Sequence, residues 1–398
     1  MANNIKIHDM KQILFICFMG LFMTTMSACK QNILEPQEND GVPPGPVSDL
    51  SVLNLSGAAT VSFVSPTDPD LAYVKAKYTT KDGKVRETKV SRYVNKITVE
   101  GFADTDTYTV TLTAVDKGEN DSSPVDVAVN PLEPPYKVAF STLKTDRDFG
   151  GINISLLNAK KASLAVIVLT NDTLKNFVPT QTNYTDVENV AFSVRGFNPI
   201  KRTFGVVVRD RWGNKSDTLR VALVPLFEER LDRTKMSGYK LPTDPALAYS
   251  GTYPGLFDDN TTGGFYHSAN GNVMPQWFTY DMGVTAKLSR LVYFMKPNRL
   301  FDEHNPKIVE IYGSNAPNPD GSFDSSWTLL TTYTMEKPSG TPAPQLSQAD
   351  ITAAAEGATI AFPLDAPRVR YIRFKTLRNW GNTSYVSVYE IRMYGDSK

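Results

Sequence analysis

Cysteine and histidine are scarce in this chain of 398 residues, which contains two cysteines and three histidines. Cys17 lies in an apolar N-terminal run, so Cys29 has no partner for a disulfide in the rest of the chain. Structural zinc sites need four nitrogen or sulfur ligands, so a Cys/His zinc cluster is excluded. An excess of one charge is also missing, because 42 basic residues balance 42 acidic ones. This balance argues against a nucleic-acid-binding protein, which usually carries a basic patch or stripe.

The N-terminal apolar run is too short to cross a bilayer, which takes about 20 residues. It covers Ile13–Met23, follows two lysines and stops just before Met26-Ser27-Ala28-Cys29. A basic start and a short apolar run are typical of an export signal, here over residues 1–28. The small residues before Cys29 resemble the lipobox of bacterial lipoproteins, which implies that Cys29 is lipidated. An ordinary signal peptide with an incidental cysteine is the alternative.

Residues 29–45 are polar and rich in proline, so they cannot bury a core and are expected to form a lipidated tether. Glu35, Glu38 and Asp40 place negative charge close to the expected anchor. These acids are similar to the export tag of surface lipoproteins of the Bacteroidetes type. The resemblance implies a lipid anchor in the outer membrane that faces the cell exterior, with a periplasmic face as the alternative.

Two segments repeat at an offset of 94 residues. Thr109–Ser122 aligns without a gap with Thr203–Ser216, and a fixed offset of domain length is typical of tandem units. Apolar residues alternate along the strands on both sides of each turn, which predicts hairpins with one face on a core. The repeat predicts two immunoglobulin-like sandwiches, at 46–131 and 132–230, and the first strand resembles fibronectin type III domains. We expect both to be spacers, with a contact through Trp212 as the alternative.

Residues 231–398 have a different pattern, with short strands and three of the four tryptophans. This spacing indicates an all-β sandwich or jelly roll. The expected strands are Gln276–Asp281, Arg290–Met295, Ile308–Ser314, Thr328–Thr334, Thr359–Pro363, Arg370–Thr376 and Tyr389–Gly395.

Six ordered motifs in this region resemble the discoidin, or coagulation-factor type C, domain with its galactose-binding-like jelly roll. They are Leu256–Asn260, Tyr266–Ser268, Pro275–Gly283, Ile308–Ser314, Val369–Phe374 and Glu390–Gly395. The predicted fold class is therefore all-β, with two tandem immunoglobulin-like sandwiches followed by a discoidin-type jelly roll.

The resemblance also implies a structural calcium ion held by Asp258, Asn260 and Glu390. Calcium takes six to eight oxygen ligands from carboxylates and loop carbonyls. The chain departs from the family at Asp259, where the family has glycine, and this departure weakens the calcium prediction.

Ligands of such domains bind to loops at one end of the jelly roll. A sugar needs an aromatic ring for its C–H face and planar polar groups for its hydroxyls. The loops 296–305 and 378–385 combine arginine, asparagine and aromatic residues. The expected ligand-binding residues are Trp380, Asn379, Asn382, Arg378, Arg299, His304, Tyr266 and His267. Packing of Trp380 in the core is the alternative for the principal candidate.

The whole arrangement looks like lipoproteins encoded beside outer-membrane glycan importers of the starch-utilisation type. This resemblance implies a non-catalytic protein that binds a polysaccharide or oligosaccharide and passes it to an importer complex. An adhesin or scaffold that binds protein is one alternative. An accessory module of a glycoside hydrolase system is another. A glycoside hydrolase itself is disfavoured, because three small modules leave no room for a catalytic barrel of about 250 residues.

Overall fold

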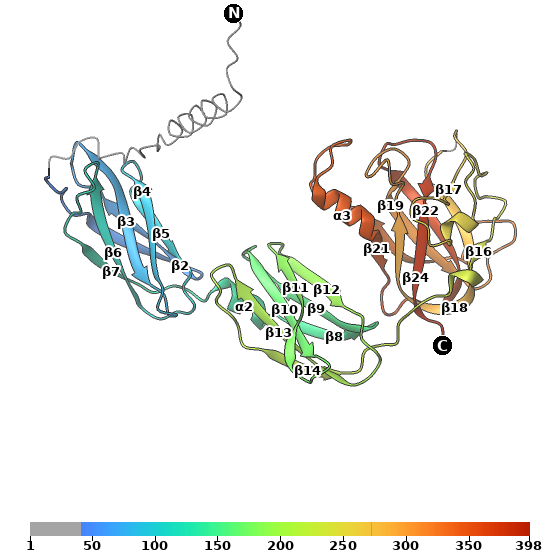
Figure 1. Cartoon of the computed structure of the whole chain (residues 1–398), viewed down its shortest axis with the longest axis horizontal. Helices are drawn as coiled ribbons and strands as arrows, with labels where there is room; N and C mark the ends of the chain where they lie inside the picture. The colour runs from blue at the N-terminus through green and yellow to red at the C-terminus, as the bar shows by residue number, and fades with distance from the viewer. Residues whose placement is uncertain (1–40, 272) are drawn as a thin grey trace, which may run out of the picture. The chain divides into compact units, whose positions relative to one another are not determined.

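The computed structural model describes residues 41–271 and 273–398, and within these ranges the chain divides into two compact units after Pro134 (Figure 1). The predicted signal peptide, Cys29 and most of the tether lie outside the described residues. In the described ranges, no helix is both long enough and apolar enough to span a bilayer.

The first unit is a sandwich of two antiparallel sheets, ordered β1-β2-β5 and β4-β3-β6-β7. Apolar side chains alternate along these strands and pack between the sheets around Val61, Val74 and Leu112, which are fully buried. The strands are β1 (Ser48–Leu55), β2 (Ala58–Val64), β3 (Leu71–Thr79), β4 (Val85–Ser91), β5 (Lys96–Glu100), β6 (Tyr108–Asp116) and β7 (Val125–Val129).

The second unit begins with a sandwich of the same strand order, β12-β9-β8 facing β11-β10-β13-β14. Ile154, Val166 and Val206 are fully buried in its core, and one short helix, α2 (Pro135–Ser141), packs on it. The strands are β8 (Lys144–Asp148), β9 (Gly151–Leu157), β10 (Leu164–Asn171), β11 (Phe177–Thr185), β12 (Asn189–Val194), β13 (Arg202–Asp210) and β14 (Leu219–Leu223).

The repeated hairpins close in the same way in both sandwiches. The Asp116 carboxylate accepts hydrogen bonds from the backbone and side-chain amides of Asn120, at 2.8 and 3.0 Å. Asp210 accepts the same two bonds from Asn214, at 2.9 and 2.8 Å. The aspartate carboxylate therefore holds each turn closed by accepting hydrogen bonds from the loop amides.

The C-terminal domain is a jelly roll organised by one long strand, β18 (Gln276–Phe294), which belongs to both of its sheets. Its first half pairs with β22 and its second half with β24, and the register shifts between Asp281 and Ala286. The other elements are β15 (Glu229–Arg230), β16 (Ser237–Gly238), β17 (Tyr266–His267), β19 (Pro306–Ser314), β20 (Thr328–Thr334), α3 (Gln348–Glu356), β21 (Ala358–Ala361), β22 (Val369–Asn379), β23 (Ser387–Val388) and β24 (Glu390–Asp396), with short 3-10 turns at Arg233–Lys235 and Pro254–Leu256.

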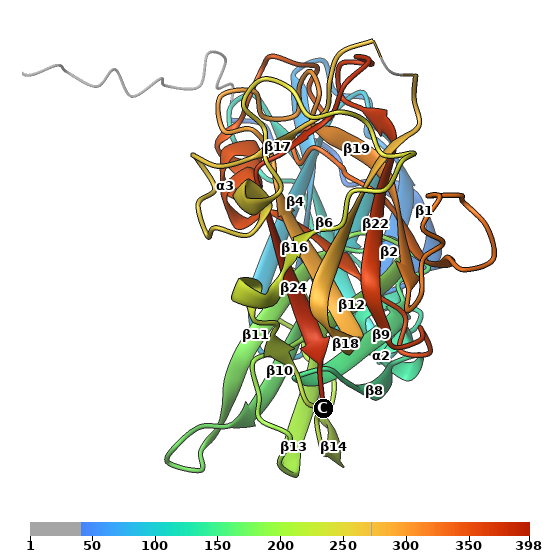
Figure 2. The same ribbon diagram turned by 90° about the vertical axis from the view of Figure 1, so that its right-hand side faces the viewer.

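The observed sandwiches confirm the predicted all-β class, with two differences in detail. The strands expected at Gln276–Asp281 and Arg290–Met295 are the two halves of β18, because the chain bends between them without leaving the sheet. The helices α2 and α3 were not expected. Figure 2 shows that β17 and the loops beside it lie at the end of the C-terminal domain opposite the C-terminus.

Candidate ligand-binding site in the C-terminal domain

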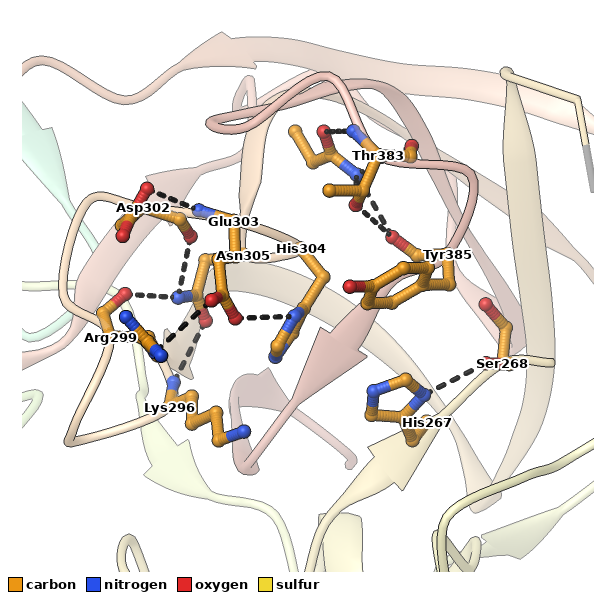
Figure 3. Close-up of polar contacts among 11 residues, drawn as sticks. His267, Ser268, Lys296, Arg299, Asp302, Glu303, His304, Asn305, Thr383 and Tyr385 are labelled. Carbon is orange, nitrogen blue, oxygen red and sulfur yellow. Dashed lines mark hydrogen bonds and ion pairs between the residues drawn. The ribbon is translucent and has the colours of Figure 1, made fainter. Parts of the chain in front are cut away.

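Two loops, 296–305 and 379–387, lie side by side at this end of the domain (Figure 3). Strands β19 and β22 bring them together, because Pro306 at the start of β19 pairs with Asn379 at the end of β22. Backbone amides of the second loop then donate to carbonyls of the first, from Gly381 to Glu303 at 2.6 Å and from Trp380 to Asn305 at 3.0 Å. The two loops that carry most of the sequence-predicted residues therefore lie together at one end of the domain.

Two buried asparagines hold the loops in shape. The Asn305 side chain accepts a hydrogen bond from the Lys296 amide at 2.8 Å and donates to the carbonyls of Arg299 and Asp302. The Asn379 amide group donates to the Thr383 hydroxyl and the Tyr385 carbonyl, at 2.8 and 2.9 Å. Asn379 has no exposed surface. The expectation that Asn379 contacts a ligand is corrected, because its side chain is buried and makes its hydrogen bonds inside the loop.

A third segment joins the loops through β17. The amide of Ala248 donates to the His267 carbonyl at 3.0 Å, and the Ser268 amide donates to the Val386 carbonyl at 3.0 Å. Gly251 approaches so closely that a Cβ there would lie 2.5 Å from the backbone nitrogen of His267. A larger residue would push residues 246–252 away from β17.

Four rings meet where these segments converge. His267 stacks on Tyr385 with ring centroids 5.3 Å apart, and His304 lies 5.2 Å from the same tyrosine. Tyr249 covers His267 at 4.7 Å and is itself 61% exposed. The two histidines are 5.0 Å apart and almost fully buried. We call Tyr249, His267, His304 and Tyr385 the ring cluster; its two tyrosines supply its accessible surface.

Both histidines of the ring cluster are held in the neutral state at pH 7. Burial lowers the pKa of His304 to about 4, and the charges of His267 and Lys296 act in the same direction. Burial also lowers the pKa of His267. The His304 Nδ1 atom lies 3.3 Å from the Glu303 carboxylate, but neither ring nitrogen has a hydrogen-bond partner within the described residues. A neutral imidazole can donate or accept a hydrogen bond at such an atom.

Polar side chains border the ring cluster. Arg299 and Glu303 form an ion pair at 3.1 Å, and Arg378 donates to the Asn382 side chain at 3.0 Å. Three of these four side chains, on Arg299, Arg378 and Asn382, are exposed. Figure 3 shows the Lys296 side chain beside the two histidine-bearing segments. The arrangement offers guanidinium and amide groups next to an aromatic surface.

Two other predicted contacts lie deeper than expected. Tyr266 is 1% exposed and packs on Phe278 with centroids 4.2 Å apart, so it belongs to the core and has no surface for a ligand. Trp380 is half-buried between Phe301, at 5.4 Å, and the ammonium of Lys307, at 4.2 Å. The structure therefore favours the packing alternative for Trp380 and corrects the assignment of Tyr266.

Sequence reasoning did not single out Tyr249 or Tyr385. Tyr385 closes a loop that was recognised, but the larger Trp380 in the same loop drew the prediction. Tyr249 precedes the first discoidin-like motif, and only its contact with His267 places it in the site. Its positive φ of 52°, uncommon for a tyrosine, was a structural signal without a sequence counterpart.

The predicted calcium ligands lie together but fit the ion poorly. Glu390 is fully buried, and among the described residues neither of its carboxylate oxygens has a hydrogen-bond partner, which is consistent with an ion ligand. Asp259, which replaces the family's glycine, pairs instead with Arg233 at 2.7 Å and with Arg230. Arg230 and Arg392 also come within 3.7 and 3.8 Å of Glu390.

The guanidinium groups of Arg230 and Arg392 therefore lie next to the carboxylate that would hold the calcium ion. Within the described ranges, no group of three or more acidic, histidine or cysteine residues could hold a metal. Asp258 and Asn260 use their side chains in turns of their own loop, where each accepts a backbone amide two residues ahead.

Comparison with known proteins agrees with this architecture. Three family models, each described as a domain of unknown function, match residues 44–131, 132–234 and 254–395. A search of curated proteins gives no significant match. A solved structure titled "SusE-like protein BT2857" is 34% identical, with a TM-score of 0.44, and the match covers 67% of this chain and 100% of that one.

Two further solved structures match with lower identity. The carbohydrate-binding module CBM32-3 of a family 31 glycoside hydrolase from Clostridium perfringens is 20% identical over 42% of this chain and 95% of that one, with a TM-score of 0.32. The C-terminal domain of a chitobiase from Bacteroides fragilis is 18% identical over 43% and 99%, with a TM-score of 0.30.

The fold and the ring cluster define an all-β protein of sandwich domains with a loop site on the last one. The chain belongs to the SusE-like proteins, because it is 34% identical to one of them over that protein's whole length. This confirms the predicted resemblance to proteins of polysaccharide-utilisation systems.

Proposed function

We propose that this protein binds carbohydrate at the cell surface through the ring cluster of its C-terminal domain. The carrying observation is that Tyr249, 61% exposed, and Tyr385 present aromatic surface at the point where three segments converge. The flat C–H face of a pyranose ring packs on such surfaces. The buried histidines beneath the tyrosines hold these rings in place, which reduces the side-chain entropy that would be lost on binding.

The groups around the cluster supply the polar half of sugar recognition. Arg299, Arg378 and Asn382 are exposed and already oriented by their pairings with Glu303 and with each other. Guanidinium groups donate in a fixed plane, and an amide both donates and accepts, which suits vicinal hydroxyls. The two neutral histidines lack the charge that would favour an anion over a neutral sugar.

The proposed anchoring and transfer role is inferred from the family and from the N-terminal sequence. In this proposal the protein is anchored by lipid at Cys29, faces the cell exterior and passes glycan to an outer-membrane importer, without catalysing a reaction. Membership in the SusE-like proteins and the lipobox-like residues before Cys29 support it. The polar tether would allow the folded units to reach glycan away from the membrane.

Glycan-array binding tests the proposed site. Tyr249→Ala should lower binding of the glycans recognised by the native protein by about 10-fold or more, because one stacked ring contributes about 1–3 kcal/mol. Its melting temperature should hardly change, since the ring is mostly exposed. Tyr93→Ala is the matched control, because Tyr93 is 82% exposed on the first unit.

Three outcomes would contradict the proposal. Equal binding by native protein and Tyr249→Ala would remove the ring cluster as the site. Release of shorter products from a bound glycan would show catalysis. Binding to a protein ligand without any glycan would favour the adhesin alternative.

The anchor has a separate test. Cys29→Ala should leave the protein unlipidated and released from the membrane fraction, because each buried CH₂ of an acyl chain contributes about 0.8 kcal/mol to membrane binding. Unchanged membrane retention of this variant would refute lipidation at Cys29.

A further inference from the structure

The middle sandwich carries a hollow of about 450 Å³ on the outer face of its four-stranded sheet. Ala165 forms its floor, and its neighbours across the sheet are Tyr184 on β11 and Arg209 on β13. Residues paired directly across strands point to the same face, so these side chains stand beside one another. The hairpin tip between β13 and β14 supplies Trp212 as a further wall.

The first sandwich shows why this hollow exists. Its residue at the position of Ala165 is Tyr73, which pairs with Ser91 and Val115 where the middle sandwich has Tyr184 and Arg209. The Tyr73 hydroxyl donates to the Glu119 carboxylate at 2.7 Å, and Lys89 lies 4.5 Å from the ring centre. In the first sandwich, Tyr73 with its neighbours Glu119 and Lys89 therefore fills the space that Ala165 leaves open in the middle sandwich.

The hairpin tips of the two sandwiches also differ in the side chain that they place beside this position. The common frame, Asp116 with Asn120 and Asp210 with Asn214, is identical in both. Between these residues the first tip has Gly118 where the second has Trp212, by the offset of 94. The Trp212 amide donates to the Asp210 carboxylate at 2.9 Å, which fixes the tryptophan on a rigid turn.

The charges around the hollow favour an anion. The Arg209 guanidinium has neither a hydrogen bond nor an ion pair within residues 41–271 and 273–398, although it is half-buried. The Asp210 carboxylate, which also lines the hollow, is already satisfied by three donors of its own turn. Tyr184, 73% exposed, adds aromatic surface next to the unpaired cation.

We propose that this hollow is a second binding site, for a sugar residue that carries a carboxylate or sulfate. Tyr184 and Trp212 would pack on the sugar ring, and Arg209 would pair with the anionic group, since a guanidinium matches both groups with paired N–H donors. The inference takes its ligand class from the proposed function but uses a different domain and different residues.

Titration of the protein with trigalacturonate, whose only anions are carboxylates, and with a kappa-carrageenan tetrasaccharide, whose only anions are sulfates, tests the site and distinguishes the two anions. Tyr184→Ser and Arg209→Gln should each lower the affinity for the recognised probe by about 10-fold. Ala165→Tyr, which copies the first sandwich, should abolish binding there. Tyr93→Ser is the control, and the melting temperature of every variant verifies folding.

The outcomes separate this site from the ring cluster. Loss of acidic-probe binding in Tyr184→Ser and Ala165→Tyr, with binding retained in Tyr249→Ala, supports the second site whatever the array shows for the first. The inference is wrong if all three variants, Tyr184→Ser, Arg209→Gln and Ala165→Tyr, are folded and bind both probes like the native protein. That result would not bear on the ring cluster, which Tyr249→Ala tests separately. Failure of the native protein to bind either probe at millimolar concentration also overturns it.

Discussion

Glu390 and His304 lie in the same domain, and both are buried titratable side chains with atoms that find no hydrogen-bond partner in the part of the chain that the structure describes. Burial pushes each toward its neutral form, raising the pKa of Glu390 to about 7 and lowering that of His304 to about 4. Their surroundings differ. Glu390 has Arg230 and Arg392 within 4 Å, whereas His304 packs among rings, 3.3 Å from the Glu303 carboxylate, and the charge of Lys296 acts on it without direct contact.

This difference separates a structural charge cluster from a place where a ligand can bind. At Glu390 the protein's own cations already occupy the approaches, so an added cation would have to displace them. At His304 the neutral ring needs no counter-ion and sits behind tyrosines that reach solvent. An unpartnered buried atom therefore indicates a ligand only when the neighbouring charges leave room for one.

The largest expected effect tests the charge cluster. Arg392→Gln should destabilise the domain by about 2–3 kcal/mol at pH 8, because it leaves the Glu390 charge less compensated, and breaking a buried pair is costly. Adding Glu390→Gln should recover most of the loss, since the double variant buries no charge. Chemical denaturation of the single and double variants measures both. If the double variant is no more stable than Arg392→Gln, the two side chains do not stabilise each other.

The comparison also predicts opposite pH dependences of stability. The folded pKa of His304, about 4, lies below its ordinary value of 6.5, so its contribution to stability is lost as the pH falls from about 6.5 to 4. The folded pKa of Glu390, about 7, lies above 4.5, so its contribution is present below about 4.5 and lost as the pH rises through 7.

Unfolding curves between pH 4 and 8 would sharpen this contrast. His304→Gln should reduce the loss of unfolding free energy at acid pH by about 1–2 kcal/mol. Glu390→Gln should reduce the loss of unfolding free energy near neutral pH by a similar or smaller amount. Parallel curves for native protein and both variants would show that neither group is perturbed by folding.

Much of the fold was accessible from the sequence because it is encoded locally. The recurrence of short strands predicted Thr328–Thr334 with its observed bounds, and the repeat predicted matching hairpins. The missed helix α3 also had a local signal, since Ser347 and Asp350 form a capping box at its start. The continuity of β18 was not accessible, because it depends on pairing with strands that lie far away in the chain.

The site was predictable as a pair of loops but not residue by residue. Asparagine and tryptophan are typical of sugar sites. Here, however, the Asn379 side chain makes its hydrogen bonds within its own loop, and Trp380 packs against Phe301. Which ring of a loop reaches solvent depends on the neighbouring segment, here the one that carries Tyr249. The calcium motif was weakened by Asp259, but the arginines that pair with it lie outside the motif.

A chelator offers a test of the charge cluster with a smaller expected effect. With arginines around Glu390 and Asp259, EDTA should leave the melting temperature unchanged within about 1 °C, because no bound ion would be removed from the folded state. Elemental analysis of the dialysed protein is the control. A clear decrease in melting temperature that added calcium reverses would restore the calcium prediction.

The smallest expected effect is on binding at the ring cluster. Burial lowers the pKa of both histidines, that of His304 to about 4, so the His304 ring stays neutral throughout the range from pH 8 to pH 5.5. The affinity of the native protein for its array-selected glycan should therefore change by less than about twofold between pH 8 and pH 5.5. A group that titrated near its ordinary value of 6.5 would change its charge within this range. Titration calorimetry at both values, with His267→Gln as a variant that has no charge to gain, measures the difference. A drop of tenfold or more in the native protein but not in His267→Gln would mean that a histidine of the cluster becomes charged and reaches the ligand, and the contrast with Glu390 would no longer hold.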